Sequence, residues 1–119
     1  MMLMISNLVY NHLKEFNDAN ANVLAGEIFP LVAPIDASNP FAVYRVSKET
    51  NFSKQGIKDV NVVITLVGDD YEQICGLADD LEAHIETKEG FNYISTEPGV
   101  NPDDPNEVNF ILTYNLKMV

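Results

Sequence analysis

The segment from Val108 to Met118 alternates between large apolar residues and smaller, mostly polar ones over its whole length. One side of such a strand would carry Val108, Phe110, Leu112, Tyr114, Leu116 and Met118. Side chains of a β-strand point to opposite faces with a period of two, so the pattern predicts a long strand with one buried face. That face needs a covering layer, which restricts the chain to folds built on a sheet.

Four other segments have the composition of strands. They are Glu27 to Ile35, Phe41 to Ser47, Val60 to Val67 and Phe91 to Ser95. The first contains Pro30 and Pro34, which predicts an irregular strand or one at the sheet edge. The polar segment Asn51 to Gly56 predicts a flexible, hairpin-like connection, and Glu97 to Asn106 predicts an acidic, Pro-rich loop.

Two segments have the apolar period of helices that bury one face. The first runs from Leu3 to about Phe16 and should end in the Asn-rich stretch Asn17 to Asn22. Its predicted stripe is Ile5, Leu8, Val9, His12, Leu13 and Phe16. The second runs from Asp70 to about Lys88, with a stripe of Tyr71, Ile74, Leu77, Ala78, Leu81 and Ile85. Asp69 and Glu72 predict its capping box, and Gly90 predicts its C-terminal end.

The predicted order is α-β-β-β-α-β-β, in an α+β domain spanning residues 1–119. The connections between strands are short for parallel crossovers, which favours a mostly antiparallel sheet. Two helices can cover one face of a five-stranded sheet. The other face would carry Val63, Val67 and Ile111 among Thr65, Asn109 and Thr113. This mixture of apolar and polar residues is typical of a subunit contact, although loops of the same chain could also cover it.

Negative charge is concentrated in one part of the sequence. The formal net charge is −11, and only 7 residues are Lys or Arg, which argues against a surface that grips DNA or RNA. Residues 69–107 hold 12 carboxylates and one lysine, so 12 − 1 = 11 negative charges lie there and the remainder is neutral. Glu72, Asp79 and Glu86 recur on the outer side of the second helix, where a solvated helix face is the simplest interpretation.

The residues that could carry chemistry are few and scattered. Cys75 and His84 lie nine residues apart, about 900° around the predicted helix, so they face opposite ways and make no dyad. Cys75 and His12 are interpreted as packing residues, and Cys75 has no cysteine to pair with, which suits a reducing compartment. The loop from Asn101 to Glu107 is rich in oxygen ligands but lacks the ligand alternation and glycine of an EF-hand.

Common hydrolase, nucleotide-binding and metalloprotease motifs do not occur in the sequence. We therefore expect no catalytic residues, no metal and no cofactor. The apolar start has no basic flank and no small-residue cleavage site, so we interpret it as a helix and not as a signal peptide. The apolar run from Val62 to Gly68 is too short to cross a membrane as a helix.

Segments spread over nearly the whole chain combine into one pattern. They are the leading helix, Glu27-Ile28-Phe29-Pro30 with Ala33-Pro34, Pro40-Phe41-Ala42-Val43-Tyr44, the strand Val60 to Val67, and the helix from Asp70-Tyr71 with Ile74, Leu77, Ala78, Leu81 and Ile85. This pattern resembles the tail-terminator proteins, also called tail-completion or minor tail proteins, of long-tailed bacteriophages and prophages. The acidic loop from Glu97 to Glu107 departs from it.

The resemblance implies a ring, usually a homo-hexamer, that caps the tail-tube protein and faces the head-side connector. It implies assembly in the host cytoplasm, a final place in the virion tail, and no catalytic residues. DNA would pass through the ring without sequence-specific binding. A channel lining of like charge would let DNA slide, and the candidates for it are Glu72, Asp79, Glu86, Asp103 and Asp104.

Three other interpretations stay open. The chain could be another connector or an assembly factor of the same virion neck. It could be a small ligand-binding or regulatory module with a pocket between the sheet and the first helix. An enzyme is the third, and it would need carboxylates that converge in a cleft.

Overall fold

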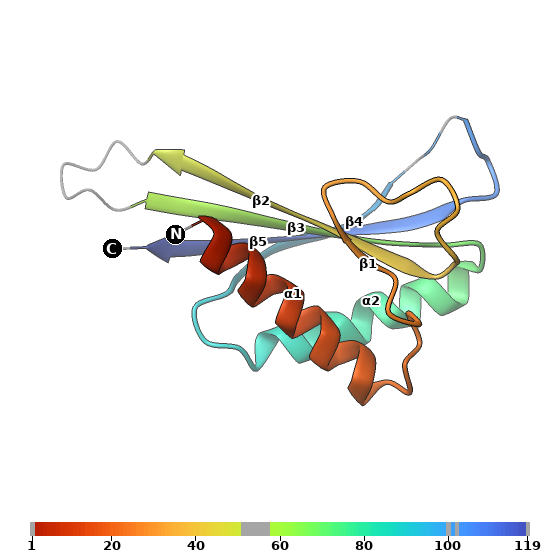
Figure 1. Ribbon diagram of the computed structural model, residues 1–119, viewed down its shortest axis with the longest axis horizontal. Helices are drawn as coiled ribbons and strands as arrows, with labels where there is room; N and C mark the ends of the chain where they lie inside the picture. The colour runs from red at the N-terminus through yellow and green to blue at the C-terminus, as the bar shows by residue number, and fades with distance from the viewer. Residues whose placement is uncertain (1, 51–57, 100, 102, 119) are drawn as a thin grey trace.

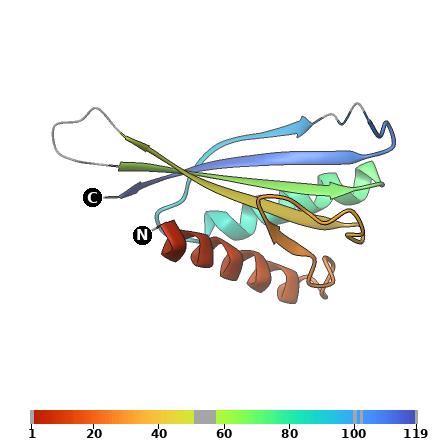
Figure 2. The same ribbon diagram turned by 45° about the horizontal axis from the view of Figure 1, so that its top comes forward.

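The protein builds one five-stranded sheet with both helices on the same face, as predicted (Figure 1, Figure 2). The computed structural model describes residues 2–50, 58–99, 101 and 103–118. The elements are α1 (Met2–Ala19), β1 (Ile28–Pro30), β2 (Phe41–Thr50), β3 (Lys58–Gly68), α2 (Tyr71–Glu86), β4 (Asn92–Gly99) and β5 (Val108–Met118). The connection predicted from Asn51 to Gly56 lies outside the described residues.

The strands lie in the order β1-β2-β3-β5-β4. Three neighbouring pairs are antiparallel, but β1 pairs in parallel with β2, with Ile28 opposite Ala42. We expected the connections between strands to be too short for parallel pairing, and this is wrong for β1 and β2. The loop 31–40 between them is long enough to bring the chain back, so that β2 runs in the same direction as β1. Strand β1 is also shorter than predicted. It ends at Pro30, and Leu31 then adopts a left-handed φ of 67°.

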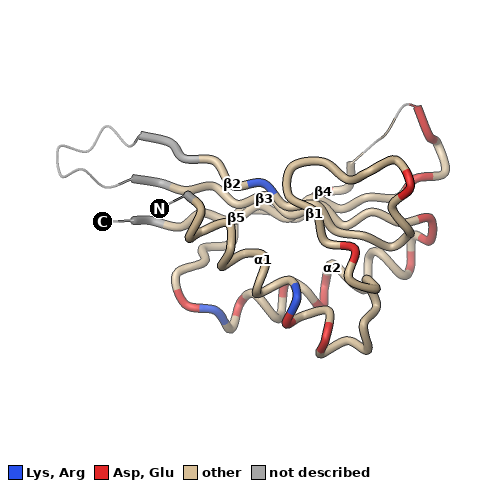
Figure 3. Tube along the Cα trace, viewed as in Figure 1, with Lys and Arg blue, Asp and Glu red and all other residues tan. Residues whose placement is uncertain are grey.

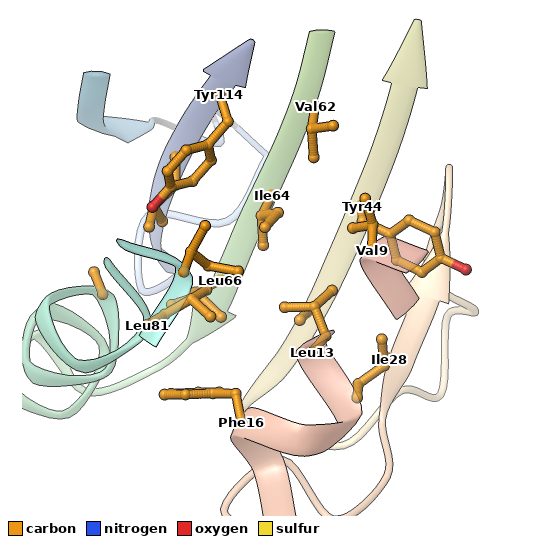
Figure 4. Packing of buried hydrophobic residues seen from close by; sticks show 14 of the residues in the cluster. Val9, Leu13, Phe16, Ile28, Tyr44, Val62, Ile64, Leu66, Leu81 and Tyr114 are labelled. Carbon is orange, nitrogen blue, oxygen red and sulfur yellow. The ribbon is translucent and has the colours of Figure 1, made fainter. Parts of the chain in front are cut away.

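Helix α1 packs along the sheet through a buried stripe. The side chains of Ile5, Val9, Leu13 and Phe16 are all buried against the strands (Figure 4). Leu8, which was predicted to belong to the stripe, is 37% exposed and lies at its edge. His12 is half-buried, with its ring 5.4 Å from the ring of Phe91.

Helix α1 continues to Ala19, three residues beyond the predicted end at Phe16. Asparagine side chains of the stretch Asn17 to Asn22 then form hydrogen bonds in the turn that follows it. Asn17 is buried, and its side-chain oxygen accepts a 2.7 Å hydrogen bond from the backbone N–H of Leu24. Its amide donates a 2.7 Å bond to Oδ1 of Asn22, a residue with a left-handed φ of 56°. These bonds satisfy polar groups that the turn would otherwise bury without partners.

Helix α2 begins one residue later than predicted. Its N-cap is Asp70 and not Asp69, because Oδ1 of Asp70 accepts from the backbone N–H groups of Glu72 at 3.1 Å and Gln73 at 3.4 Å. The predicted stripe is otherwise buried at Ile74, Leu77, Ala78, Leu81 and Ile85. Tyr71 is 61% exposed, since it stands at the first residue of the helix, with its ring tilted against that of Phe110 at a centroid distance of 5.7 Å.

Strand β4 is longer than the predicted segment from Phe91 to Ser95, and it takes in the start of the predicted acidic loop. Pro98 is tolerated within it because β4 is an edge strand. The register with β5 shifts between Tyr93 and Ser95, as at a β-bulge. The alternation of β5 is confirmed, with Phe110, Leu112, Tyr114 and Leu116 buried on the helix side.

Candidate functional site

The face of the sheet opposite the helices is the first candidate surface. No described helix covers it (Figure 2). The strand registers place the three predicted contact residues together on this face. Val63 lies beside Thr113, Thr65 lies beside Ile111, and Val67 lies beside Asn109 on the neighbouring strand. Val63 and Ile111 are half-buried, whereas Val67 is only 7% exposed and has little area left to offer a partner.

Strands β1 and β2 add further apolar residues to this face, which were not among the predicted contact residues. Phe41 lies opposite Val67, Val43 lies opposite Thr65, and the ring of Phe29 packs edge-on against Phe41 with centroids 6.2 Å apart. In the sequence, Phe41 and Val43 alternate with Ala42 and Tyr44, and this strand period would have predicted that Phe41 and Val43 share the face opposite the helices. We name the set Phe29, Phe41, Val43, Val63, Val67 and Ile111 the open apolar face.

Polar residues surround the open apolar face. Toward the far ends of β3 and β5, Asn115 donates a 3.1 Å hydrogen bond to Oδ1 of Asn61. Arg45, opposite Val63, and Glu97, opposite Ile111, are both exposed. An apolar centre with a polar surround is the usual anatomy of a protein interface.

Among the described residues, loops of the same chain reach one end of this face. The loop 31–40 and the loop before β5 meet at a cavity of about 420 Å³, whose lining includes Ile35, Phe41, Gly68 and Asp104. The cavity lies at the junction where β2 begins and β3 ends. The alternative that loops cover the face therefore applies near Phe41, and Val63 lies further along the sheet.

The five predicted acidic residues are all exposed but form two groups (Figure 3). Glu72, Asp79 and Glu86 project from α2. Asp103 and Asp104 lie in the loop before β5, near the N-terminal end of α2, because the end of β3 pairs with the start of β5. Glu72 and Asp79 lie on the side of α2 opposite its buried stripe, and the open apolar face lies on the far face of the sheet.

The polar side chains of the loop before β5 stabilise its turns. Oδ1 of Asn101 accepts from the backbone N–H of Asp103 at 3.0 Å, and Oδ1 of Asp104 accepts from that of Asn106 at 3.1 Å. Within the described part of the chain, no three His, Cys, Asp or Glu side chains gather as metal ligands would. Cys75 is half-buried and packs against the core.

A small ionic cluster joins the C-terminal parts of α1 and α2. Nζ of Lys88 lies 2.8 Å from Oε1 of Glu15, and Nε2 of His84 lies 3.9 Å from the same oxygen. The ring of His84 packs edge-on against Phe16 with centroids 5.7 Å apart. Burial, and then the charge of Lys88, lower the pKa of His84 below its ordinary value, and the pKa of His12 is lowered for the same two reasons.

These histidines predict a loss of stability in mild acid. A lowered pKa means that the unfolded chain binds protons more readily than the folded one, so the free energy of unfolding falls as the pH drops through about 6.5. Urea unfolding at pH 7.5 and 5.5 should show this fall for the natural chain. The double variant His12→Gln, His84→Gln should show a smaller one, and an equal fall in both proteins contradicts the assignment.

A ligand-binding module would place its pocket between α1 and the sheet, and much of that region is occupied by core side chains. The stripe of α1 contributes buried side chains to it (Figure 4). A cavity of about 260 Å³ does lie between the N-terminal part of α1 and the strands β1 and β2, with Leu3, Leu31 and Tyr44 among its lining residues, and it is small and partly bounded by the exposed Leu3 and Leu31. Neither described helix has the length and apolar character needed to cross a membrane.

Comparison with solved structures supports the fold, whereas sequence comparisons find no match. No protein-family model matches the chain, and no curated protein sequence matches it significantly. Among solved structures, a chain from the virion of a native gene transfer agent particle is similar, with a TM-score of 0.58. The similarity covers 92% of this chain and 90% of that chain, at 12% sequence identity. At this identity the match shows a shared fold over nearly the full length of both chains.

Proposed function

We propose that this chain is a non-catalytic structural protein of a phage-like virion, and within that class a tail terminator. It forms a ring of identical subunits that caps the tail tube and joins it to the head-side connector. The observation that carries this proposal is the fold shared with a chain of a gene transfer agent virion along 92% of this sequence. The sequence resemblance to tail terminators supports the same conclusion from independent features.

The open apolar face supports self-assembly. A closed ring uses head-to-tail contacts, in which one surface of a subunit meets a different surface of its neighbour. The described residues offer a second apolar surface at the N-terminal half of α1, where Leu3 is 73% exposed and Met4 and Leu8 are also exposed. It lies on the helix side of the sheet, so the two surfaces can alternate around a ring.

The acidic side of α2 supports a role next to DNA. Glu72, Asp79 and Glu86 are exposed on α2, and Glu72 and Asp79 lie opposite its buried stripe. In a ring whose channel is lined by α2, these carboxylates would repel the phosphate backbone and keep DNA from sticking. We propose that assembly takes place in the host cytoplasm and that the ring then remains in the virion tail.

Electron microscopy of reconstituted tubes tests the proposal. The purified protein is mixed with polymerising tail-tube protein of the same virus and imaged in negative stain. We expect shorter tubes, each with a ring of extra density at one end, because a bound terminator blocks further addition of subunits. Tube protein alone is the control. Bare tube ends and an unchanged length distribution at saturating protein would contradict the assignment.

A further inference from the structure

A second candidate site lies between the C-terminal half of α2 and the edge strand β4. It is a cavity of about 350 Å³. Its lining consists of Glu82, Glu86, Phe91, Asn92, Tyr93 and Tyr114. These residues come from three separate parts of the sequence and include two carboxylates and three aromatic rings, but no basic side chain.

Tyr114 gives this cavity an unused hydrogen-bonding group. The residue is only 2% exposed, and its hydroxyl is buried without a hydrogen-bond partner among the described residues. Figure 4 shows the ring on the helix side of β5, with the oxygen pointing away from Ile64 and the centre of the core. A buried hydroxyl without a partner destabilises a fold, so its presence in a cavity wall indicates a polar occupant.

The carboxylates of the cavity lining favour a positively charged occupant. Glu82 and Glu86 are one helical turn apart on α2, so both carboxylates belong to the same side of the cavity. The hydroxyl of Thr96 donates a 3.3 Å hydrogen bond to Oε2 of Glu82. The same hydroxyl accepts a 2.8 Å hydrogen bond from the hydroxyl of Tyr93. Burial, and then the charge of Glu82, raise the pKa of Tyr114, so its hydroxyl stays protonated and neutral.

The aromatic rings favour an organic cation over a metal ion. The rings of Tyr93 and Phe91 pack edge-on against Tyr114, with centroids 5.8 and 6.2 Å away. Carboxylates beside aromatic faces attract ammonium and guanidinium groups by ion pairing and cation–π attraction. The lining provides only two carboxylates, fewer oxygen ligands than calcium or magnesium requires.

We propose that this cavity binds an alkylammonium or guanidinium group, in which the cation pairs with Glu82 and Glu86 and donates to the hydroxyl oxygen of Tyr114. The group can come from a free polyamine or from a Lys or Arg side chain of a partner protein. The site shares Glu86 with the proposed channel lining, but its other evidence is local to α2, β4 and β5 and does not depend on ring formation.

NMR titration of the 15N-labelled chain tests the site with n-butylammonium and ethylguanidinium as probes and 1-butanol as the neutral control. We expect saturable shifts of the amide signals of Glu82, Asn92 and Tyr93 with at least one cation and not with butanol. Glu82→Gln should weaken binding about tenfold, whereas Glu72→Gln, which removes a carboxylate of α2 outside the cavity, should not. No saturable shift with either cation, or equal shifts with butanol, overturns the proposal.

Tyr114→Phe separates a binding role from a structural one. It should weaken cation binding several-fold and at the same time raise the melting temperature of the free protein, because the unpaired hydroxyl is gone. Unchanged cation affinity in this variant overturns the role of Tyr114. Titration with spermidine and with blocked lysine and arginine then identifies the source. Tighter binding of spermidine indicates a free polyamine, and tighter binding of a blocked amino acid indicates a partner side chain.

Discussion

An Ile111→Asp substitution is expected to abolish ring formation and to leave the monomer folded. Ile111 lies within the open apolar face, between Thr65 of β3 and Glu97 of β4. A carboxylate there remains hydrated in the monomer but would lose its water in a subunit contact, and it would also repel Glu97. An uncompensated buried charge costs about 3–5 kcal/mol, which is on the order of a thousandfold in affinity.

The measurement must include tube ends, because the proposed ring forms on the end of a tail tube. Capped ends are counted by electron microscopy, and self-association is followed by light scattering. Val63→Asp should behave like Ile111→Asp, since Val63 lies on the same face and is also half-buried. Ala83→Asp is the matched control, because it adds the same charge at an exposed position of α2. Normal capping by both sheet variants would place the subunit contact elsewhere.

Short-range patterns predicted the elements of this fold well. The stripe of α2 from Ile74 to Ile85 follows the helical period, and the inward side of β5 follows the strand period. The errors at element ends have local causes. Asp69 and Asp70 both offer a carboxylate in front of the helix, and only the backbone geometry selects Asp70 as the cap. Leu8 sits at the margin of its stripe, where periodicity alone does not decide burial.

Features that depend on distant residues could not be predicted in the same way. The parallel pairing of β1 with β2 depends on the path of the loop 31–40, which no local pattern specifies. The cavity beside Tyr114 was also missed. The alternation of β5 correctly assigned Tyr114 to the buried side, but the sequence does not show that Glu82 of α2 and Tyr93 of β4 stand around it. Burial was predictable from the sequence, whereas the absence of a partner for the hydroxyl was not.

The two faces of the molecule have different physical characters, and this division agrees with the proposed ring. When another subunit covers the open apolar face, apolar surface is removed from water, and this stabilises the assembly. The outer side of α2 carries exposed carboxylates, and burying them without a positively charged partner would cost free energy. A subunit built in this way can join copies through one side and keep a hydrated, negative surface on the other.

A Phe16→Ala substitution is expected to cause the largest loss of stability in the free protein, about 3–5 kcal/mol. Phe16 is fully buried at the C-terminal part of α1, where its ring packs against His84 of α2 (Figure 4). Removing the ring leaves a cavity where the two helices and the sheet meet. A domain of this size is stable by only about 5–15 kcal/mol, so the variant should unfold at a much lower urea concentration.

Leu8→Ala is the matched control for this experiment. It truncates another apolar side chain of α1, but one that is 37% exposed and lies outside the buried stripe. Its effect should stay below about 1 kcal/mol, because little apolar area is returned to water and no enclosed cavity forms. Both variants are compared with the natural chain by urea unfolding at pH 7.5, where His84 is neutral in the folded and unfolded states. Equal losses in the two variants would mean that α1 does not dock through the face that contains Phe16.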